Sequence, residues 1–596
     1  MVDASPAVVN DPMPHQSPTP KTTSRILFVI LLSACGLFFA GISVGLPEAV
    51  HSDEGFEIHR ALKLGAGVFD FDRTMKGGLF YLLFVEYGGY FAWLWVTGSI
   101  TSAEEFMVGF IEDPSPFWII GRATVALLSV GLVFLSYRLG AAIYGRRVGL
   151  IGAAATTATV LVVRMAHYVN VDVLMSVAVL WSILLSFEWA NPDKKPRPIL
   201  LGIAFALAVM AKATAVVAIV PILVANVLRH RKTSWKSALF GRELVLTLAI
   251  AAIVYVCGNP GIVVNAADVV KTTSRVVLGS SDDVGATEQA VIAESSRSGE
   301  NLWLFYSDVL AKSFGLPFFC LTACGLAFAC VKRDRGDIVM LAFLVPFFLL
   351  IAGAQTKNLY YARYVLVATP LLAILGARVL VAACDRVSWV RARSALVAAM
   401  VAAVLLMPTS WTTAQWTYKH LRGDTRAIAR EWIEANVPSG AVVLAQGNPA
   451  VEIAMTVPLR NTAANLDRLI ASMPDPKGFK ARFLEIRKHT TRGVPYDLHG
   501  FRHFEPVKSL DQYQALGVRY FVITKESFYP AYTEPGQRRD DIWRSRLELY
   551  EALTSHPNAT LIYEIDSDQE QLSGPSIVVF HLDLPADAPA EDTRGT

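Results

Sequence analysis

The sequence is poor in charged residues. Only 18% of its 596 residues are charged and 53% are hydrophobic, whereas roughly a quarter of an average soluble protein is charged. This composition excludes disordered, collagen-like and disulfide-scaffold proteins, and a soluble protein of this length would need far more polar surface. The net charge of +3 gives no sign of nucleic acid as a partner. The sequence therefore predicts a polytopic membrane protein.

Several signatures of soluble enzymes are also missing. The six cysteines show no zinc-site spacing with each other or with histidines. The polar C-terminal region has no cysteine and hence no disulfide. It also lacks a phosphate loop and a nucleophile elbow. Chemistry is therefore expected where charged residues meet the membrane surface.

Eleven apolar runs are predicted to cross the membrane, at 1.5 Å of rise per helical residue and about 30 Å of hydrocarbon. These runs are 26–46, 117–139, 148–164, 172–190, 199–211, 213–228, 243–259, 308–331, 337–354, 364–383 and 394–410. A twelfth run, 77–98, contains Glu86, five glycines and many aromatics, which is typical of an interfacial segment. Residues 198–228 are short for two spans, so we expect a hairpin of short helices bent at Lys212.

Lysine and arginine fix the expected orientation, because short cytoplasmic loops are rich in them. If 77–98 does not cross, every basic loop falls on the side of the N-terminus. These loops are Arg146-Arg147, Lys194 to Arg197, Arg229 to Arg242, Lys332 to Arg335 and Arg386 to Arg393. We therefore expect a multi-pass protein of the plasma membrane with a cytoplasmic N-terminus and an extracytoplasmic C-terminal domain.

Three regions follow from this topology. Residues 1–24, rich in Pro, Ser and Thr, are expected to be a disordered cytoplasmic tail. Residues 25–410 form the transmembrane module, with a first outside loop (48–116) that contains interfacial helices. Residues 411–596 are predicted to be an α/β domain, with a helix capped by Asp424 and strands near 441–445, 518–524 and 576–582.

An acidic cluster follows the first span. Asp53, Glu54 and Glu57 lie within five residues at the expected membrane surface. Carboxylates at a helix N-terminus can simply complement the helix dipole. Charged residues at other outside span ends favour a functional interpretation. They are Lys76, Arg164, His167, Asp172, Lys357, Tyr361 and Arg363. Carboxylates can act as general bases, while cations and tyrosine hydroxyls can hold a phosphate leaving group.

These residues resemble motifs of the GT-C membrane glycosyltransferases that use polyprenyl-phosphate sugars. That group includes protein O-mannosyltransferases, aminoarabinose transferases of lipid A and galacturonosyltransferases of lipopolysaccharide core. The similar pieces cover roughly 25–410. They are Asp53-Glu54, Lys76-Gly-Gly-Leu-Phe-Tyr, Ala166 to Asp172, Gly202 to Lys212, and Tyr360 to Tyr364 with Pro370. The aminoarabinose branch often has Lys-Pro-Pro where this chain has Lys76-Gly-Gly, which argues against that branch.

The resemblance implies a role for each matching residue. Asp53 would be the general base and Glu54 would position it or bind the acceptor. Lys76 and Arg363, with Tyr361, would bind the carrier phosphate. Asp172 and His167 would line the same cavity. The resemblance implies no required cofactor, and it is compatible with a bound divalent metal ion.

The expected function is thus inverting transfer of a sugar from a polyprenyl-phosphate donor to a hydroxyl of a protein, lipid or glycan. Two other classes of protein predict different features. A transporter or flippase would show charges deep in its spans and inverted repeats. A non-catalytic assembly protein would depend on its soluble domain and not on Asp53. The sequence identifies neither the sugar nor the acceptor.

Overall fold

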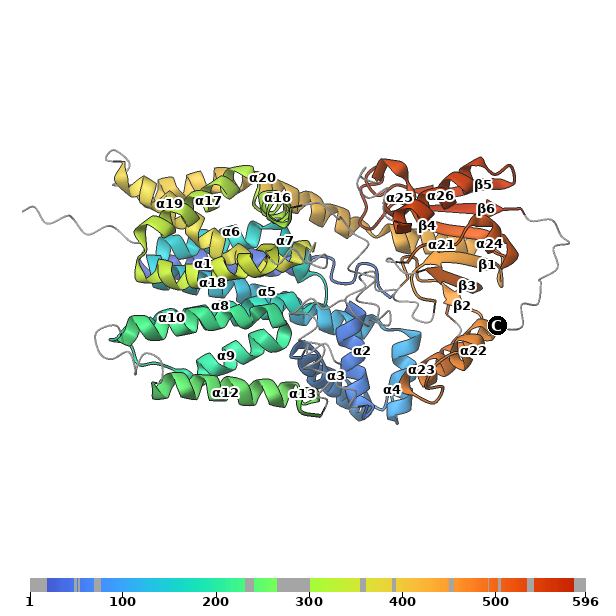
Figure 1. Cartoon of the computed structure of the whole chain (residues 1–596), viewed down its shortest axis with the longest axis horizontal. Coiled ribbons are helices and arrows are strands. Elements are labelled where there is room, and N and C mark those ends of the chain that lie inside the picture. The colour runs from blue at the N-terminus through green and yellow to red at the C-terminus, as the bar shows by residue number, and fades with distance from the viewer. Residues whose placement is uncertain are drawn as a thin grey trace, which may run out of the picture.

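The computed structural model describes residues 19–47, 51, 54–68, 77–230, 241–264, 301–353, 361–387, 393–449, 455–490, 492–501, 505–532 and 541–583. A bundle of apolar helices forms one part, and a sheet domain near the C-terminus forms the other (Figure 1). The first helix, α1 (Pro20–Phe39), begins within the expected N-terminal tail, because Thr19 caps it by accepting a hydrogen bond from the backbone of Thr22. Residues 1–18 of that tail lie outside the described residues.

All eleven expected apolar runs are helical, although some of these helices are broken. After α1 the bundle contains α5 (Ser115–Tyr144), α6 (Arg146–Ala158), α7 (Val160–Ala166), α8 (Val171–Ala190), α9 (Pro198–Ala211), η1 (Ala213–Ala218), α10 (Ile219–His230), α12 (Arg242–Gly258), α13 (Gly261–Val264), α16 (Leu302–Phe314), α17 (Leu316–Lys332), α18 (Arg335–Gly353), η3 (Ala362–Ala368), α19 (Thr369–Arg386) and α20 (Ser394–Arg422).

Eight helical segments among the described residues are long and apolar enough to cross a membrane. α6 and α7 are so only when taken together, and a bend of 63° between them is typical of a broken span or of a re-entrant loop. The two shorter apolar helices α9 and α17 also lie in the bundle. Close helix contacts hold it together. A side chain at Gly202 of α9 would lie 2.6 Å from the Thr247 carbonyl oxygen of α12. Small residues at such crossings let membrane helices approach closely.

The expected hairpin at Lys212 is present. Lys212 has an extended backbone (φ −159°, ψ 130°) between α9 and η1, and α10 continues from η1. The α9 helix packs against both α8 and α12. The break therefore places a lysine between two buried helical segments, beside the start of α8.

The loop 48–116, which is expected to lie outside and is called the first outside loop, contains three helices among its described residues: α2 (Glu54–Gly65), α3 (Leu79–Val96) and α4 (Ala103–Glu112). They lie between the bundle and the sheet domain, and α3 is steeply inclined to α8 and α10 (Figure 1). By length and composition α3 could span a membrane. The expectation that 77–98 lies along the membrane surface stays a prediction.

The C-terminal domain is built on a six-stranded sheet of order β2-β3-β1-β4-β6-β5. The strands are β1 (Val442–Gln446), β2 (Arg460–Asn461), β3 (Pro495–Phe501), β4 (Tyr520–Thr524), β5 (Ala559–Ile565) and β6 (Ile577–Leu582). β2, β3, β1 and β4 are parallel, and the last two strands are antiparallel to their neighbours.

Helices cover both faces of this sheet. α21 (Thr425–Asn436) packs on one face, and α24 (Leu510–Ala515), α25 (Lys525–Phe528) and α26 (Asp541–Ser555) pack on the other, with η6 (Pro530–Tyr532) after α25. α22 (Ala463–Ala471) and α23 (Phe479–Lys488) pack against each other and extend from the sheet toward α4 (Figure 1). Alternate residues of β1 enter opposite cores, with Val443 against α21 and Leu444 against α26. Asp424 caps α21, as expected from the sequence. The expected strands at 441–445, 518–524 and 576–582 correspond to β1, β4 and β6.

The domain rests on the first outside loop through an aromatic contact. The ring of His59 in α2 meets Phe110 of α4, Trp118 of α5 and Phe483 of α23, with centroids 5.6, 6.5 and 5.9 Å apart. Burial lowers the pKa of His59, and the charge of Arg487 lowers it further. The imidazole is therefore neutral near pH 7 and packs as an aromatic side chain.

Candidate active site

Glu54 is the best-anchored residue of the acidic cluster. Arg122 of α5 donates from Nε to one carboxylate oxygen and from Nη2 to the other, each at 2.8 Å. The pair is almost fully buried, with 1% of the arginine side chain and none of the glutamate exposed. The third guanidinium nitrogen, Nη1, donates to the carbonyls of Ile42 and Val44 after α1. Arg122 thereby ties the end of the first span to the start of α2.

The acidic segment also contacts the turn before α8. The backbone N–H of Val169 donates to Glu54 Oε1 at 3.1 Å. The ring of His51 stacks on Tyr168, with centroids 4.5 Å apart. Burial raises the pKa of Tyr168, so its hydroxyl stays protonated. Asp53 lies outside the described residues, but His51 and Glu54 on either side of it both meet this turn.

Asp172, in the first turn of α8, brings two cations together. Its Oδ1 lies 2.6 Å from Nζ of Lys212, and its Oδ2 lies 3.8 Å from Nε of Arg363. The carboxylate itself is buried, with 4% of its side chain exposed. It does not cap the helix, because Asn170 accepts the capping hydrogen bond from Val173. Asp172 is thus left to hold Lys212 and Arg363.

Two tyrosines support these cations. Lys212 Nζ lies 3.7 Å from the ring centroid of Tyr364, and the Arg363 guanidinium lies 4.5 Å from that of Tyr361. The two rings meet edge to face, with centroids 5.6 Å apart. Aromatic faces attract cations in this arrangement. The structure therefore brings three of the predicted residues, Asp172, Tyr361 and Arg363, into one cluster with Lys212.

The glycine pair after Lys76 lies next to this cluster. The Gly77 N–H donates to the Met210 carbonyl oxygen at 2.7 Å, two residues before Lys212. A side chain at Gly77 would lie 2.9 Å from the carbonyl oxygen of Gly258, and Gly78 has φ +105°. Close approach and positive φ both favour glycine here. Lys76 itself lies outside the described residues, so its phosphate role stays a prediction.

His167 lies apart from this cluster. It is 2% exposed, and its ring nitrogens lie 2.7 Å from the Val163 carbonyl oxygen and 2.9 Å from that of Ala40. Its ring also meets Trp416 and His420 of α20. These contacts join α1, α7 and α20. A substrate-binding role for His167 stays a prediction.

Arg122 was not expected as a site residue, and Lys212 was expected at a bend and within the similar piece Gly202 to Lys212 but had no assigned role. A signal existed for both. Arg122 is a charge inside the apolar run 117–139, and Lys212 is a charge at a helix break. Within the described ranges, no three His, Cys, Asp or Glu side chains gather as a metal site.

Part of this chain is similar to a known protein family. A model of the dolichyl-phosphate-mannose-protein mannosyltransferase family matches residues 118–257, which include Arg122, Asp172 and Lys212. A search of curated proteins finds no significant match. The chain is a multi-pass membrane protein. This partial match agrees with the expected resemblance to glycosyltransferases that use lipid-phosphate sugars, and no match supports the transporter alternative.

Two solved structures are similar in overall shape. One is the oligosaccharyltransferase of Archaeoglobus fulgidus in the apo form, with 12% identity and a TM-score of 0.48, covering 95% of this chain and 89% of that chain. The other is ArnT from Cupriavidus metallidurans bound to undecaprenyl phosphate, with 13% identity and a TM-score of 0.47, covering 94% of this chain and 98% of that chain.

Proposed function

We propose that this glycosyltransferase moves a sugar from a polyprenyl-phosphate carrier to an acceptor hydroxyl at the extracytoplasmic face of the plasma membrane, with inversion. One observation carries the proposal. The turn at 168–169 binds the acidic segment, and Asp172, which holds Lys212 and Arg363, follows three residues later. A carboxylate segment and a pair of cations therefore meet at the start of α8.

Asp53 takes the proton of the acceptor hydroxyl. The freed oxygen forms a bond to the anomeric carbon, and the bond from that carbon to the carrier phosphate breaks. The electron pair leaves with the polyprenyl phosphate. Glu54 positions the acidic segment through Arg122 and does not itself need to touch the substrate.

Lys212 and Arg363 hold the leaving phosphate, with Lys76 as a further ligand. The donor phosphodiester carries one negative charge, whereas a released phosphate monoester carries about −1.5 to −2 at pH 7. Negative charge therefore grows as the bond breaks. Cations fixed beforehand by Asp172, Tyr361 and Tyr364 stabilise the transition state more than the bound donor, which is what accelerates a reaction.

The direct test incubates the purified protein with radiolabelled polyprenyl-phosphate sugars and cell-envelope extract. We expect label to move from the lipid to an acceptor, with inverted anomeric configuration in the product. A matched reaction contains the D172N/K212Q variant. If no donor in a broad panel is consumed by the wild-type protein, or if the variant transfers sugar at the wild-type rate, the proposal is wrong.

A further inference from the structure

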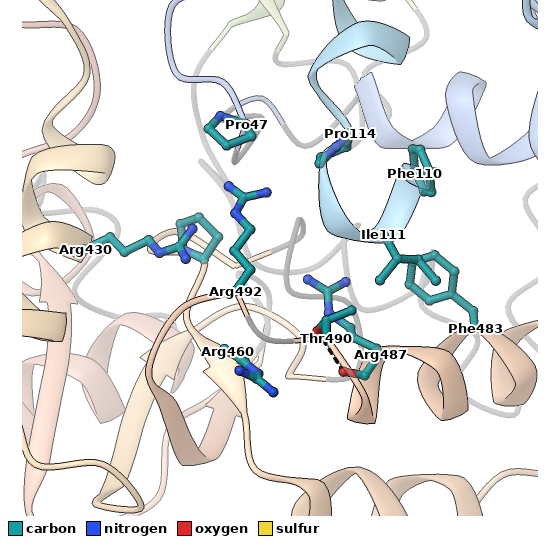
Figure 2. Close-up of a pocket in the computed structure, with 11 residues that line it drawn as sticks. Pro47, Phe110, Ile111, Pro114, Arg430, Arg460, Phe483, Arg487, Thr490 and Arg492 are labelled. Carbon is teal, nitrogen blue, oxygen red and sulfur yellow. Dashed lines mark hydrogen bonds between the residues drawn. The ribbon is translucent and has the colours of Figure 1, made fainter. Parts of the chain in front are cut away.

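A basic pocket lies where the C-terminal domain meets the first outside loop (Figure 2). It is separate from the Asp172 cluster. Its walls come from the end of the first span, from α4 and the start of α5, and from α21, α23 and the loops beside β2 and β3. The lining residues are Pro47, Phe110, Ile111, Pro114, Arg430, Pro458, Arg460, Phe483, Arg487, Thr490 and Arg492. Four of these eleven are arginines, and none of them is acidic.

Three of the arginines converge on one turn. Arg460 Nη1 donates to the Gly493 carbonyl oxygen at 3.1 Å. Gly493 has φ +78°, and a side chain there would lie 2.7 Å from Nη2 of Arg430. Arg492, the preceding residue, donates from Nη1 to the Glu112 carbonyl oxygen at the end of α4, at 3.3 Å. The turn thus contacts Arg430 and Arg460, and Arg492 links the domain to the loop. Figure 2 shows the Arg460 guanidinium directed away from those of Arg430 and Arg492.

The side chains are suitably directed for a shared ligand. Figure 2 shows the guanidinium groups of Arg430 and Arg492 approaching each other in the space below Pro47, with that of Arg487 on the far side of Thr490. Arg430 is held by Glu434, whose Oε1 lies 2.7 Å from its Nε. Arginine forks match the oxygen geometry of phosphate and carboxylate and bind them in pairs of hydrogen bonds. A ligand with two negative charges would bind several guanidinium groups more tightly than a neutral ligand would.

The opposite wall is apolar. Phe110 and Ile111 of α4 and Phe483 of α23 face the arginines across the pocket. Pro47 ends the segment after the first span, and the acidic segment begins only a few residues later at His51. An anionic group in the pocket would therefore be held beside the loop that carries the proposed base. An apolar wall next to a cationic one suits an amphipathic molecule.

We propose that this pocket binds a phosphate group of the acceptor and so holds the acceptor for sugar transfer. This inference rests on the proposed function, because it assigns the donor phosphate to Lys212 and Arg363 and leaves the pocket for the second substrate. The ligand class is a phosphate monoester or pyrophosphate, carried either by a lipid or by a soluble saccharide. The acceptor is then selected by charge before its hydroxyl reaches the acidic segment.

The test measures anion binding separately from sugar transfer. The full-length protein is reconstituted in phosphatidylcholine nanodiscs and titrated calorimetrically with inorganic pyrophosphate and with glucose 1-phosphate. A parallel set of nanodiscs contains phosphatidic acid in place of part of the phosphatidylcholine, and bound lipid is identified by mass spectrometry. The variants are R430Q/R492Q and R430K/R492K. R468Q/R544Q is the matched control, because these arginine side chains are 60% and 55% exposed in the same domain.

We expect R430Q/R492Q to weaken pyrophosphate binding at least about tenfold, because the charge-assisted hydrogen bonds from both guanidinium groups to the phosphate oxygens are lost. The control should bind as the wild type does. R430K/R492K keeps the charge and the fold but removes the forked guanidinium groups. Its pyrophosphate affinity should therefore lie between that of the control and that of the double Gln variant. Retained phosphatidic acid would identify a lipid source, and binding of glucose 1-phosphate alone would identify a soluble one.

Equal pyrophosphate affinity in the wild type, R430Q/R492Q and R430K/R492K would overturn the inference. So would equal losses in the control. If the wild type binds pyrophosphate through these arginines but transfers no sugar from any donor, the anion site stands and the proposed function fails. If sugar transfer is intact in the wild type and anions do not bind the pocket, only this inference fails.

Discussion

The change of Glu54 to Gln removes the charge from the buried pair and keeps the shape of the side chain. In the wild type both carboxylate oxygens accept from Arg122 at 2.8 Å, and one also accepts from Val169. The variant leaves a guanidinium that is 1% exposed beside a neutral amide. Breaking a buried ion pair in this way destabilises a protein by about 3–5 kcal/mol.

The expected shift in melting temperature follows from the size of the chain. If all 596 residues unfold together, with an entropy of about 2.1 cal/mol/K per residue, this loss lowers Tm by roughly 2–4 °C. If only a part of the chain unfolds as one cooperative unit, the decrease in Tm is larger. Thermal unfolding in detergent micelles measures it. E104Q is the control, because Glu104 is exposed on α4 in the same outside loop.

A second variant separates stability from positioning. E54M/R122M replaces the whole pair with apolar side chains of similar size, which commonly restores stability. Sugar transfer should remain low, because the N–H of Val169 and the carbonyls after α1 lose the partners that hold the acidic segment. The reasoning is refuted if E54Q melts like the wild type, or if E54M/R122M regains full transfer activity.

Three further predictions concern other parts of the site. K212Q should lower kcat about 10²–10³-fold, because the loss of one hydrogen-bond donor to the transition state has an effect of this size. The affinity for the polyprenyl-phosphate sugar should change less. Equal losses in kcat and in this affinity would show that Lys212 only binds the sugar donor. G77A should lower both stability and activity, because the added carbon would lie 2.9 Å from the Gly258 carbonyl oxygen; unchanged melting would show that the two backbones can separate. The lowered pKa of His59 in the folded protein means that the unfolded chain takes up its proton first as the pH falls. Stability should therefore decline from about pH 7 to about pH 5 in the wild type, and less in H59F. Melting temperatures measured across this pH range check it. If Tm falls with pH equally steeply in both proteins, His59 is not the cause of the decline.

The architecture of the bundle was largely predictable from the sequence. Long runs of apolar residues predict membrane helices directly, because the backbone polar groups of each span must form hydrogen bonds within that span. The bend at Lys212 followed from the length of 198–228 between two basic flanks. Strands β1, β4 and β6 were readable because they are short β-branched and aromatic runs. β2 has only two residues, and β5 keeps most of its side chains half-buried or exposed, so neither shows a clear local pattern.

The site was only partly predictable. Asp172, Tyr361 and Arg363 were expected together and are found together. The partner of Glu54 was not expected, because Arg122 lies 68 residues further along and its charge is hidden in an apolar run. The four-arginine pocket was missed for the same reason: Arg430, Arg460, Arg487 and Arg492 come from separate elements. Pairings of this kind depend on tertiary packing, which local periodicity does not report.

The most direct test of the catalytic account is single-turnover sugar transfer by D53N, with donor binding measured on the same preparation. The matched control is D113N, because Asp113 is an exposed carboxylate in the same outside loop. Loss of a general base should slow transfer about 10²–10⁴-fold, while donor binding stays as in the wild type and D113N remains fully active. Transfer by D53N at close to the wild-type rate would contradict the role of Asp53 as the base.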